Sequence, residues 1–456
     1  MLSRIASFSP SPTVGNYLVL FILILWTGFR LSVYGDPSVS IAGNDTITFV
    51  EGSQVPLFSA EIMTGRRLLT TNLVYKIFEP DQGYEILVNG SLETSRRAFQ
   101  EGFDGIVILQ TVFSILGWSA LTWVVATNMQ SFAAKLVAAL VIPAFAYTPQ
   151  IADWDSILMS ESLTFSMFVL QLALLIHIVF LLYKNPDAKV TPWVVAWGVV
   201  YFFWANVRDS NNYAAVVLIG LAGLTLFVPK FKNHKVLIGI IGFSAILFLV
   251  GLVTFQQSGR SLISTINIYI GDIFPHPSRV EFMQTELGMP TPETPEFYAW
   301  FEEHGVTGAT RFIFAHPGYA LEKLIRDFPN AFKQGTQSYF VMPEIKLLRV
   351  RLNALGESLH PETATPFVIG IVLLSGIVFA GLTNNTNTSQ PWAWIGVYLF
   401  LAASIAIVPT ILGDTWALHR HTIFSIAMYR LGMWVFALIL MDIALQKQPA
   451  QLIQHP

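Results

Sequence analysis

Acidic and basic side chains gather in this sequence at the ends of long apolar stretches, and their types suit the binding of an anion. The set comprises Asp153, Asp155, Glu161, Arg208, Asp209, Asp414, Arg420 and His421. A guanidinium group can hold a phosphate through two hydrogen bonds at once. Because ionisable groups at membrane depth are costly unless they are paired or face water, we expect these side chains to line a polar site at one membrane boundary.

The composition predicts that a membrane surrounds most of the chain. Of its 456 residues, 53% are hydrophobic and 12% are charged, whereas soluble domains carry about 25% charged residues. With a mean hydropathy of +0.56, the chain has more apolar surface than a compact core can hide, so part of that surface must face lipid. These values exclude a soluble globular enzyme and a disordered chain.

The charge and the cysteine content exclude further classes. The formal net charge is -3, which offers no basic face for nucleic acid, because phosphate binding needs clustered Lys and Arg in excess. The chain has no cysteine. Disulfides, thiol nucleophiles and thiolate metal sites are therefore ruled out.

Ten apolar stretches are long enough to be predicted as membrane helices. They begin near Val14, Ile106, Phe132, Leu163, Pro192, Tyr213, Val236, Pro366, Trp392 and Thr422. The sequence therefore predicts an all-α membrane fold with about ten transmembrane helices.

Lysines indicate the orientation of these helices. The short loops on one side hold Lys135, Lys184, Lys189, Lys230, Lys232 and Lys235, whereas those on the other side hold Arg208 and Arg420. Positively charged short loops tend to stay in the cytoplasm. We therefore expect an integral protein of the plasma (inner) membrane, with both termini cytoplasmic and the polar set facing outside.

Two long polar segments are expected on the outer side and divide the chain into three parts. Residues 1–254 hold the first seven spans and a first outer loop at 30–105. Residues 255–365 form a small extracytoplasmic cap, and residues 366–456 hold the last three spans.

Both outer segments are predicted to be helical. In the first outer loop, amphipathic pieces around Leu57–Met63 and Leu68–Phe78 are typical of helices that lie in the membrane interface. In the cap, helical runs cover Thr294–Glu303 and Tyr319–Phe328, and turns rich in Pro and Gly separate them.

Cations at the membrane boundary favour a ligand that is a phosphate with a lipid tail. Such a phosphate is a good leaving group, and guanidinium groups stabilise the charge that grows on it. A carboxylate within hydrogen-bond reach of an acceptor hydroxyl can then take its proton. We therefore expect transfer of a sugar from a lipid-linked phosphate donor to an acceptor hydroxyl, with inversion at the sugar carbon.

Four blocks of sequence carry a family resemblance. The first block, at 51–78, is an acid followed by a helical piece, a Gly and a Leu-Val-Tyr stretch. The other three are Asp-Trp-Asp-Ser-Ile-Leu-Met-Ser-Glu-Ser-Leu at 153–163, Val-Arg-Asp-Ser-Asn-Asn-Tyr at 207–213, and Gly-Asp-Thr-Trp-Ala-Leu-His-Arg-His at 413–421. In this order they resemble the GT-C superfamily of polytopic glycosyltransferases that use polyprenyl-phosphate sugars, which includes the protein mannosyltransferases and the lipid A aminoarabinose transferase. The resemblance is to uncharacterised bacterial members.

The resemblance implies a role for each candidate residue. The catalytic carboxylate of the characterised enzymes lies in the first outer loop, where Glu51 is the nearest match by position and Asp45 is the alternative. The donor phosphate is expected to meet Arg208, Arg420, His421 and Arg66. The acids expected to bind substrate are Asp153, Asp155, Glu161, Asp209 and Asp414. For Glu161 an equal alternative is that it stabilises the start of its own helix.

No cofactor is predicted. His419 and His421 are two residues apart and do not share a helix face, so they do not suit a metal ion. Asp153 and Asp155 could bind a divalent cation in an irregular loop, but this is not favoured. The expected partners are the polyprenyl-phosphate sugar donor, the lipid bilayer, and an acceptor that is a lipid, a glycan or a protein.

Two other functions stay open. A transporter or lipid flippase would carry charges along a path through the membrane midplane, but apart from His177 and Asp442 the span interiors are almost free of ionisable residues. A catalytically inactive scaffold with the same fold predicts that the outer pocket exists and that Glu51 lies outside it.

Overall fold

Helices make up nearly all of the regular structure in the computed structural model of this chain. The structure describes residues 12–43, 45–86, 100–231, 234–333, 347–383, 388–416 and 418–447; Lys232 lies outside them. Within these residues the β pairing consists of one isolated bridge between Ile41 and Ile157. The all-α prediction is therefore confirmed for the described part of the chain.

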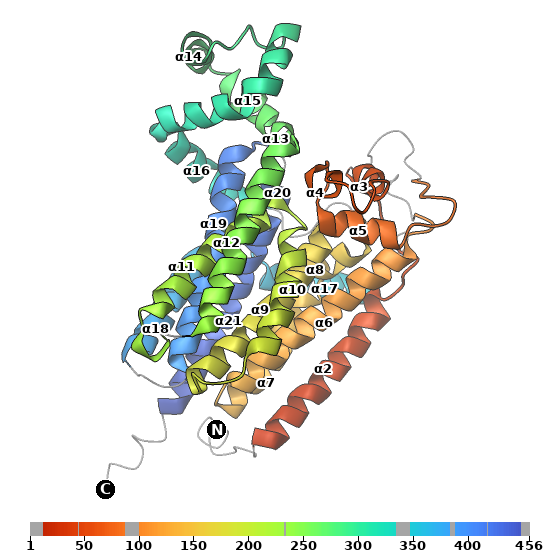
Figure 1. Cartoon of the computed structure of the whole chain (residues 1–456). Helices are drawn as coiled ribbons and strands as arrows, with labels where there is room; N and C mark the ends of the chain where they lie inside the picture. The colour runs from red at the N-terminus through yellow and green to blue at the C-terminus, as the bar shows by residue number, and fades with distance from the viewer. Residues whose placement is uncertain are drawn as a thin grey trace.

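A helix is present at each of the ten predicted places. These helices are α2 (Pro12–Tyr34), α6 (Asp104–Asn128), α7 (Phe132–Ala146), α9 (Glu161–Lys184), α10 (Thr191–Ala205), α11 (Ala214–Leu226), α12 (Lys235–Gln257), α18 (Thr365–Thr383), α19 (Ser389–Gly413) and α21 (Ile423–Lys447). Figure 1 shows most of them running side by side as one elongated bundle.

Fewer than ten of these helices are long enough to cross a membrane alone. Among the described residues seven helices have the necessary length and hydropathy, and an eighth span results if α7 is joined to α8 (Pro149–Ala152) and η2 (Asp153–Ser156) across a bend of 53°. Helices α10 and α11 have 15 and 13 residues, short of the roughly 20 needed to cross the hydrocarbon core. These long apolar helices make the protein an integral membrane protein. The number of ten membrane-spanning helices stays a prediction.

Helix α9 lies at the centre of the bundle, and neighbouring helices bury most of its residues. It packs along α6, where Gly117 faces the backbone of Ser166. A Cβ atom at Gly117 would lie 2.4 Å from the Ser166 carbonyl oxygen, so a glycine is required for this close approach. Because Glu161 is the first residue of α9, the central helix carries this acid into the interior at one end of the bundle.

Three short helices of the first outer loop cover that same end of the bundle (Figure 1). They are α3 (Thr46–Ser53), α4 (Glu61–Thr64) and α5 (Leu69–Ile77). The piece predicted at Leu68–Phe78 corresponds to α5. The piece predicted at Leu57–Met63 is mostly a turn followed by α4, because the chain reverses after Pro56 and leaves Phe58 fully exposed.

The segment predicted as a cap extends beyond the end of α12. It holds α13 (Arg260–Ile268), the π-helical turn η5 (Tyr269–Ile273), α14 (Pro277–Leu287), α15 (Pro295–Ala315), α16 (Pro317–Ala331) and α17 (Leu347–Leu359). Helices α13 to α15 stand above the bundle (Figure 1) and surround a small core of their own, which includes Tyr269, Met283 and Phe297. Helix α17 instead packs against α8.

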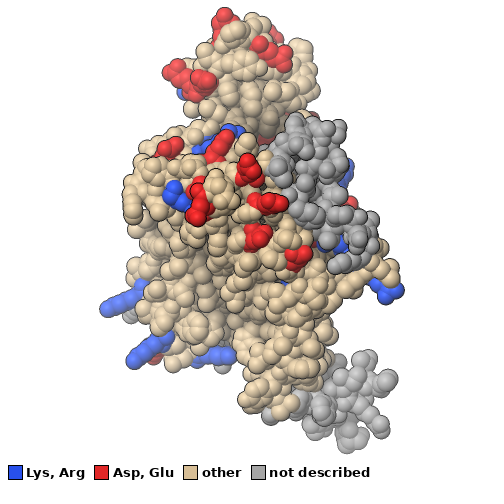
Figure 2. All heavy atoms as spheres, turned by 90° about the vertical axis from the view of Figure 1, so that its right-hand side faces the viewer, with Lys and Arg blue, Asp and Glu red and all other residues tan. Residues whose placement is uncertain are grey.

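The two ends of the bundle differ in charge. Figure 2 shows Lys and Arg side chains around the lower end and Asp and Glu side chains over the upper part. Lys184 ends α9 and Lys235 begins α12, both at the end away from the first outer loop. The separation agrees with the expected lysine asymmetry, while the compartment and the orientation of the termini stay predictions.

The spans hold more charge than the sequence analysis expected. Arg430, which was overlooked, is buried in α21 and donates hydrogen bonds to the carbonyl oxygens of Pro361 and Phe332. Asp442 accepts hydrogen bonds from the backbone N–H groups of Gln130 and Ser131, just before α7. Both groups therefore tie helix ends together.

Candidate functional site

Five charged side chains from distant parts of the sequence meet where the first outer loop covers the bundle. Asp45 precedes α3, Arg67 lies between α4 and α5, and Glu161 begins α9. Arg208 precedes the short helix η3 (Asp209–Tyr213), and Arg420 lies in α20 (Leu418–His421). Salt bridges join all five. We call these five residues the charge cluster.

Glu161 is the buried centre of the charge cluster. Its side chain is fully buried, and its Oε1 atom accepts a hydrogen bond from Arg208 Nη2 at 3.0 Å and lies 3.3 Å from Arg420 Nε. Its other oxygen, Oε2, is buried without a hydrogen-bond partner among the described residues. A carboxylate at the first position of a helix also gains from the positive end of the helix dipole. One oxygen of Glu161 is thus available for a further donor.

Asp45 is the second acid of the charge cluster and lies nearer to solvent. It contacts Arg67 Nη2 at 3.1 Å and forms a short salt bridge with Arg420. Partial burial raises the pKa of Asp45, but Arg420 and Arg67 outweigh burial and hold the pKa below its ordinary value. Asp45 is therefore ionised at neutral pH and able to accept a proton.

Arg67 is fixed by contacts on its other sides. Its guanidinium carbon lies 4.1 Å from the centre of the Phe49 ring, and its Nε atom donates a hydrogen bond to Thr48 Oγ1 at 2.6 Å. The flat guanidinium group can stack on an aromatic ring while its edge donates hydrogen bonds. Sequence reasoning gave Arg67 no role, although it adjoins the predicted Arg66.

Glu51 and Arg66 are not part of the charge cluster. Their side chains are 60% and 61% exposed, and the closest approach between Glu51 Oε2 and Arg66 Nη1 is 3.9 Å. Glu51 comes six residues after Asp45, and a helix turns by about 600° over that distance. The two acids therefore point to different sides of α3, and the structure brings Asp45 to the arginines.

Asp153 and Asp155 lie in η2, where two arginines that the sequence analysis did not single out reach them. Arg30, near the end of α2, forms a buried salt bridge with Asp155, and Ser162 Oγ donates a hydrogen bond to Asp155 Oδ1 at 2.6 Å. Arg349 of α17 forms a salt bridge with Asp153. These pairs attach α2 and α17 to η2, so both acids already hold a cation.

Asp209 and Asp414 connect the segment 255–365 to the bundle. Arg260, at the start of α13, donates to both oxygens of Asp209, at 3.0 and 2.9 Å, and to the Gly65 carbonyl oxygen at 2.7 Å. Arg260 was also missed, because it belongs to a segment without a recognisable motif.

Asp414 pairs with His421, a residue that was predicted to bind the donor phosphate. Its Oδ2 atom lies 2.6 Å from His421 Nδ1, and its Oδ1 atom accepts a hydrogen bond from Asn267 of α13 at 3.0 Å. Burial raises the pKa of Asp414, but His421 and the hydrogen-bond donors outweigh burial and hold it below its ordinary value. His421 therefore faces Asp414 in the structure and not the charge cluster.

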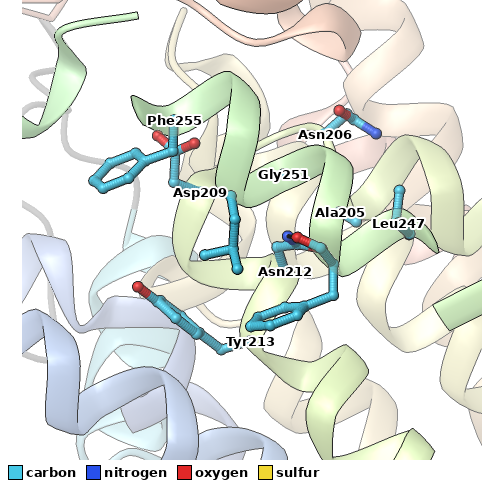
Figure 3. Close-up of a pocket in the computed structure, with 10 residues that line it drawn as sticks. Ala205, Asn206, Asp209, Asn212, Tyr213, Leu247, Gly251 and Phe255 are labelled. Atoms are coloured by element: carbon cyan, nitrogen blue, oxygen red, sulfur yellow. Dashed lines mark hydrogen bonds between the residues drawn. The ribbon is translucent and has the colours of Figure 1, made fainter. Parts of the chain in front are cut away.

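A small open cleft lies beside Asp209, between α10, η3 and α12. Its polar end holds Asn206, Asp209 and Asn212, and its other lining residues are mostly apolar side chains of α12 (Figure 3). A Cβ atom on Gly251 would lie 1.9 Å from Asn212 Nδ2, so the glycine makes room for this amide. The cleft therefore joins a polar end to an apolar wall.

The described residues do not include a group of three or more His, Asp or Glu that could hold a metal ion. Every acid predicted to bind substrate contacts a cationic or imidazole side chain instead. The arrangement suits competition by an anionic ligand for the arginines.

Comparisons with known proteins give matches among solved structures alone. Neither the family models nor the curated proteins that were compared match this sequence. The fold is similar to the oligosaccharyltransferase of Archaeoglobus fulgidus in its apo form, with 11% identity, a TM-score of 0.46 and coverage of 95% of this chain and 51% of that chain. It is also similar to the archaeal oligosaccharyltransferase AglB from Archaeoglobus fulgidus in complex with an inhibitory peptide and a dolichol-phosphate, with 12% identity, a TM-score of 0.48 and coverage of 93% and 50%.

This chain thus spans about half the length of the oligosaccharyltransferase chains that it matches.

Removal of Arg208 tests whether the charge cluster holds the structure together. Arg208→Ala leaves the fully buried Glu161 with Arg420 as its remaining cation, so we expect the free energy of unfolding to fall by about 1 to 3 kcal/mol. The matched variant Arg66→Ala breaks an exposed contact with Glu51 and should change the free energy of unfolding by less than about 0.5 kcal/mol. Thermal unfolding in detergent measures both, and equal Tm values for the two variants would contradict the assignment.

Proposed function

We propose that this chain is a membrane glycosyltransferase that transfers a sugar from a polyprenyl-phosphate donor to an acceptor hydroxyl. The observation that carries the proposal is the convergence of three arginines and two carboxylates from five separate segments at one end of an apolar helical bundle. The resemblance of four sequence blocks to the GT-C superfamily points to the same class.

The charge cluster is suited to bind the donor phosphate. Three guanidinium groups and two carboxylates leave a net charge of 3 − 2 = +1. Arg420 is shared between Asp45 and Glu161, so a phosphate that approaches it competes with carboxylates of the protein. Guanidinium groups form charge-assisted, often bidentate hydrogen bonds with phosphate as they do with carboxylate, so a phosphate can take the place of a carboxylate at Arg420.

Asp45 supplies the general base in this proposal. The acceptor oxygen attacks the anomeric carbon, the bond from that carbon to the phosphate oxygen breaks, and the hydroxyl proton passes to Asp45. The leaving phosphate keeps the bonding electron pair, and Arg420 and Arg67 stabilise its charge. Once the phosphate draws these arginines towards itself, the pKa of Asp45 rises and the carboxylate becomes a better base.

The cleft beside Asp209 offers a place for the first isoprene units of the carrier. Its wall on α12 is apolar, and α12 exposes large apolar side chains along its length. Arg208 of the charge cluster is the neighbour of Asp209 in the chain. A carrier could therefore keep its tail in lipid beside α12 while its phosphate reaches the arginines.

We place the site on the extracytoplasmic face of the plasma membrane of a bacterium, with both termini cytoplasmic. The support is the position of exposed lysines at the opposite end of the bundle and the tendency of basic loops to remain inside. The acceptor is a hydroxyl of a lipid, a glycan or a protein, and the reaction uses no cofactor.

An inactive scaffold is the second candidate function, because Glu51 lies outside the charge cluster as that hypothesis expects. The presence of Asp45 beside two arginines supports the enzyme instead. A transporter receives less support, since the charge cluster lies at one end of the bundle (Figure 1) and not along its middle.

Replacement of the two acids of the first outer loop separates the enzyme from the scaffold. In a deletion strain complemented with each variant, Asp45→Asn should lower the glycan product at least 100-fold, the usual contribution of a general base. Glu51→Gln should stay within about twofold of the unchanged protein. Mass spectrometry of envelope glycans, with immunoblots for protein level, gives the result.

Three outcomes of that experiment would count against the proposal. Full product from Asp45→Asn removes Asp45 as the base. Loss of product in Glu51→Gln alone moves the role to Glu51. Identical glycans with and without the gene, in cells that express it, favour the scaffold.

A bulky side chain in the cleft tests the position of the carrier tail. Leu252→Trp fills the cleft from α12, so we expect at least a tenfold higher KM for a polyprenyl-phosphate sugar with kcat within about threefold, because binding energy common to ground and transition state is lost. The control is Leu249→Trp on the same helix, at an exposed residue that does not line the cleft. Equal KM values for both variants would place the tail elsewhere.

A further inference from the structure

Helix α16 leaves part of its apolar side exposed. Leu321, Leu324, Ile325 and Phe328 recur with the spacing i, i+3, i+4 and i+7, which in a water-soluble protein marks the side of a helix that faces the core. In this structure Leu321 and Ile325 are 60% and 67% exposed. Phe314, at the end of α15, is 80% exposed. We call Phe314, Leu321, Leu324, Ile325 and Phe328 the apolar stripe.

The opposite side of α16 buries charge. Lys323 is fully buried, and its Nζ atom lies 2.7 Å from Asp272 Oδ2 and 2.9 Å from Asp327 Oδ2. Tyr319 donates a hydrogen bond to Asp272 Oδ2 at 3.1 Å, and Arg326 Nη2 lies 3.0 Å from Asp272 Oδ1. Lys323 and Asp327 are therefore satisfied inside the protein. Leu321 and Ile325 point away from it, while Leu324 and Phe328 are half-buried against the main core.

This arrangement is the reverse of a helix that faces water. A protein surface in contact with lipid turns its ionisable groups inward, where they pair with each other, and leaves apolar side chains outside. Large exposed apolar patches on a protein in water mark an interaction site. Both rules apply to α16.

The apolar stripe is continuous with the surface of a candidate span. The ring of Phe328 lies 4.9 Å from that of Phe367, in the first turn of α18. Further along α18, Val368 and Val372 are exposed, as expected for a helix in contact with lipid. Helix α16 also contacts α19, at the upper end of the bundle (Figure 1).

We infer that the apolar stripe of α16 lies in the acyl-chain region of the adjacent membrane leaflet and anchors the segment 255–331 to the bilayer. The lipid bilayer is the occupant that fits, because the stripe continues the exposed apolar surface of the candidate span α18 and because Lys323 and Asp327 are paired on the protein side. The inference does not depend on sugar transfer. It can fail while the proposed function holds, and it can hold while the proposed function fails.

The absence of cysteine makes a direct test simple. Ile325→Cys and Leu321→Cys each provide one thiol for a nitroxide label in the full chain, reconstituted in phosphatidylcholine nanodiscs. Val372→Cys on α18 is the lipid reference. Glu303→Cys on α15, at a side chain that is mostly exposed to solvent, is the aqueous reference.

Power-saturation EPR then compares the access of oxygen with that of a water-soluble nickel chelate. We expect the labels at positions 321 and 325 to resemble the label at 372, with at least threefold less nickel access than the label at 303 and high oxygen access. Nickel access equal to that at 303 would place the stripe in water and overturn the inference.

Low access to both reagents, or dipolar broadening between labels, would show that protein covers the stripe, and this outcome also overturns the inference. All four positions are on the surface, so the variants should elute as the unchanged protein does. Thermal unfolding of each labelled variant checks the fold, which is intact if the Tm equals that of the wild-type protein.

Discussion

A buried charge must be paired, and this requirement determines how the upper end of the protein is built. Glu161 is fully buried at the start of the central helix α9, and an isolated carboxylate there would be strongly unfavourable. Arg208 and Arg420 satisfy it from two other segments, and Arg420 extends to Asp45, which precedes α3. One acid in one helix thereby fixes the first outer loop and the segment before the last span in the same place.

The same rule repeats around the charge cluster. Asp155 holds α2 through Arg30, Asp153 holds α17 through Arg349, and Asp209 holds α13 through Arg260. These ties stabilise the fold, and they also set what a ligand must do. A phosphate that binds to Arg420 replaces a carboxylate of the protein, so binding of the donor and release of the base become one event in our proposal.

The helices could be predicted from the sequence because apolar length is a local property. The stretches that begin near Val14 and Val236 became α2 and α12, and α16 was expected from the run Tyr319–Phe328. The pairs of Asp45 with Arg420 and of Asp155 with Arg30 could not be predicted, since residues 375 and 125 positions apart leave no periodic signal.

The side of a short helix was equally hard to predict. Glu51 and Asp45 were both plausible bases by position, and only the rotation of α3 decides which of them meets the arginines. Helix α16 is a related case. Its apolar spacing is visible in the sequence. Which side of the helix faces the protein is set by the buried Lys323, and this lysine is buried because it pairs with Asp272 of another segment.

Binding of a lipid phosphate to the arginines is the claim on which the account depends most directly. ³¹P NMR of a short-chain polyprenyl phosphate, titrated with the protein in nanodiscs, measures it without knowledge of the sugar or the acceptor. We expect a saturable shift of the phosphate resonance with the unchanged protein and with Arg66→Ala, and at least tenfold weaker binding with Arg420→Gln. Equal affinity of all three proteins would contradict it.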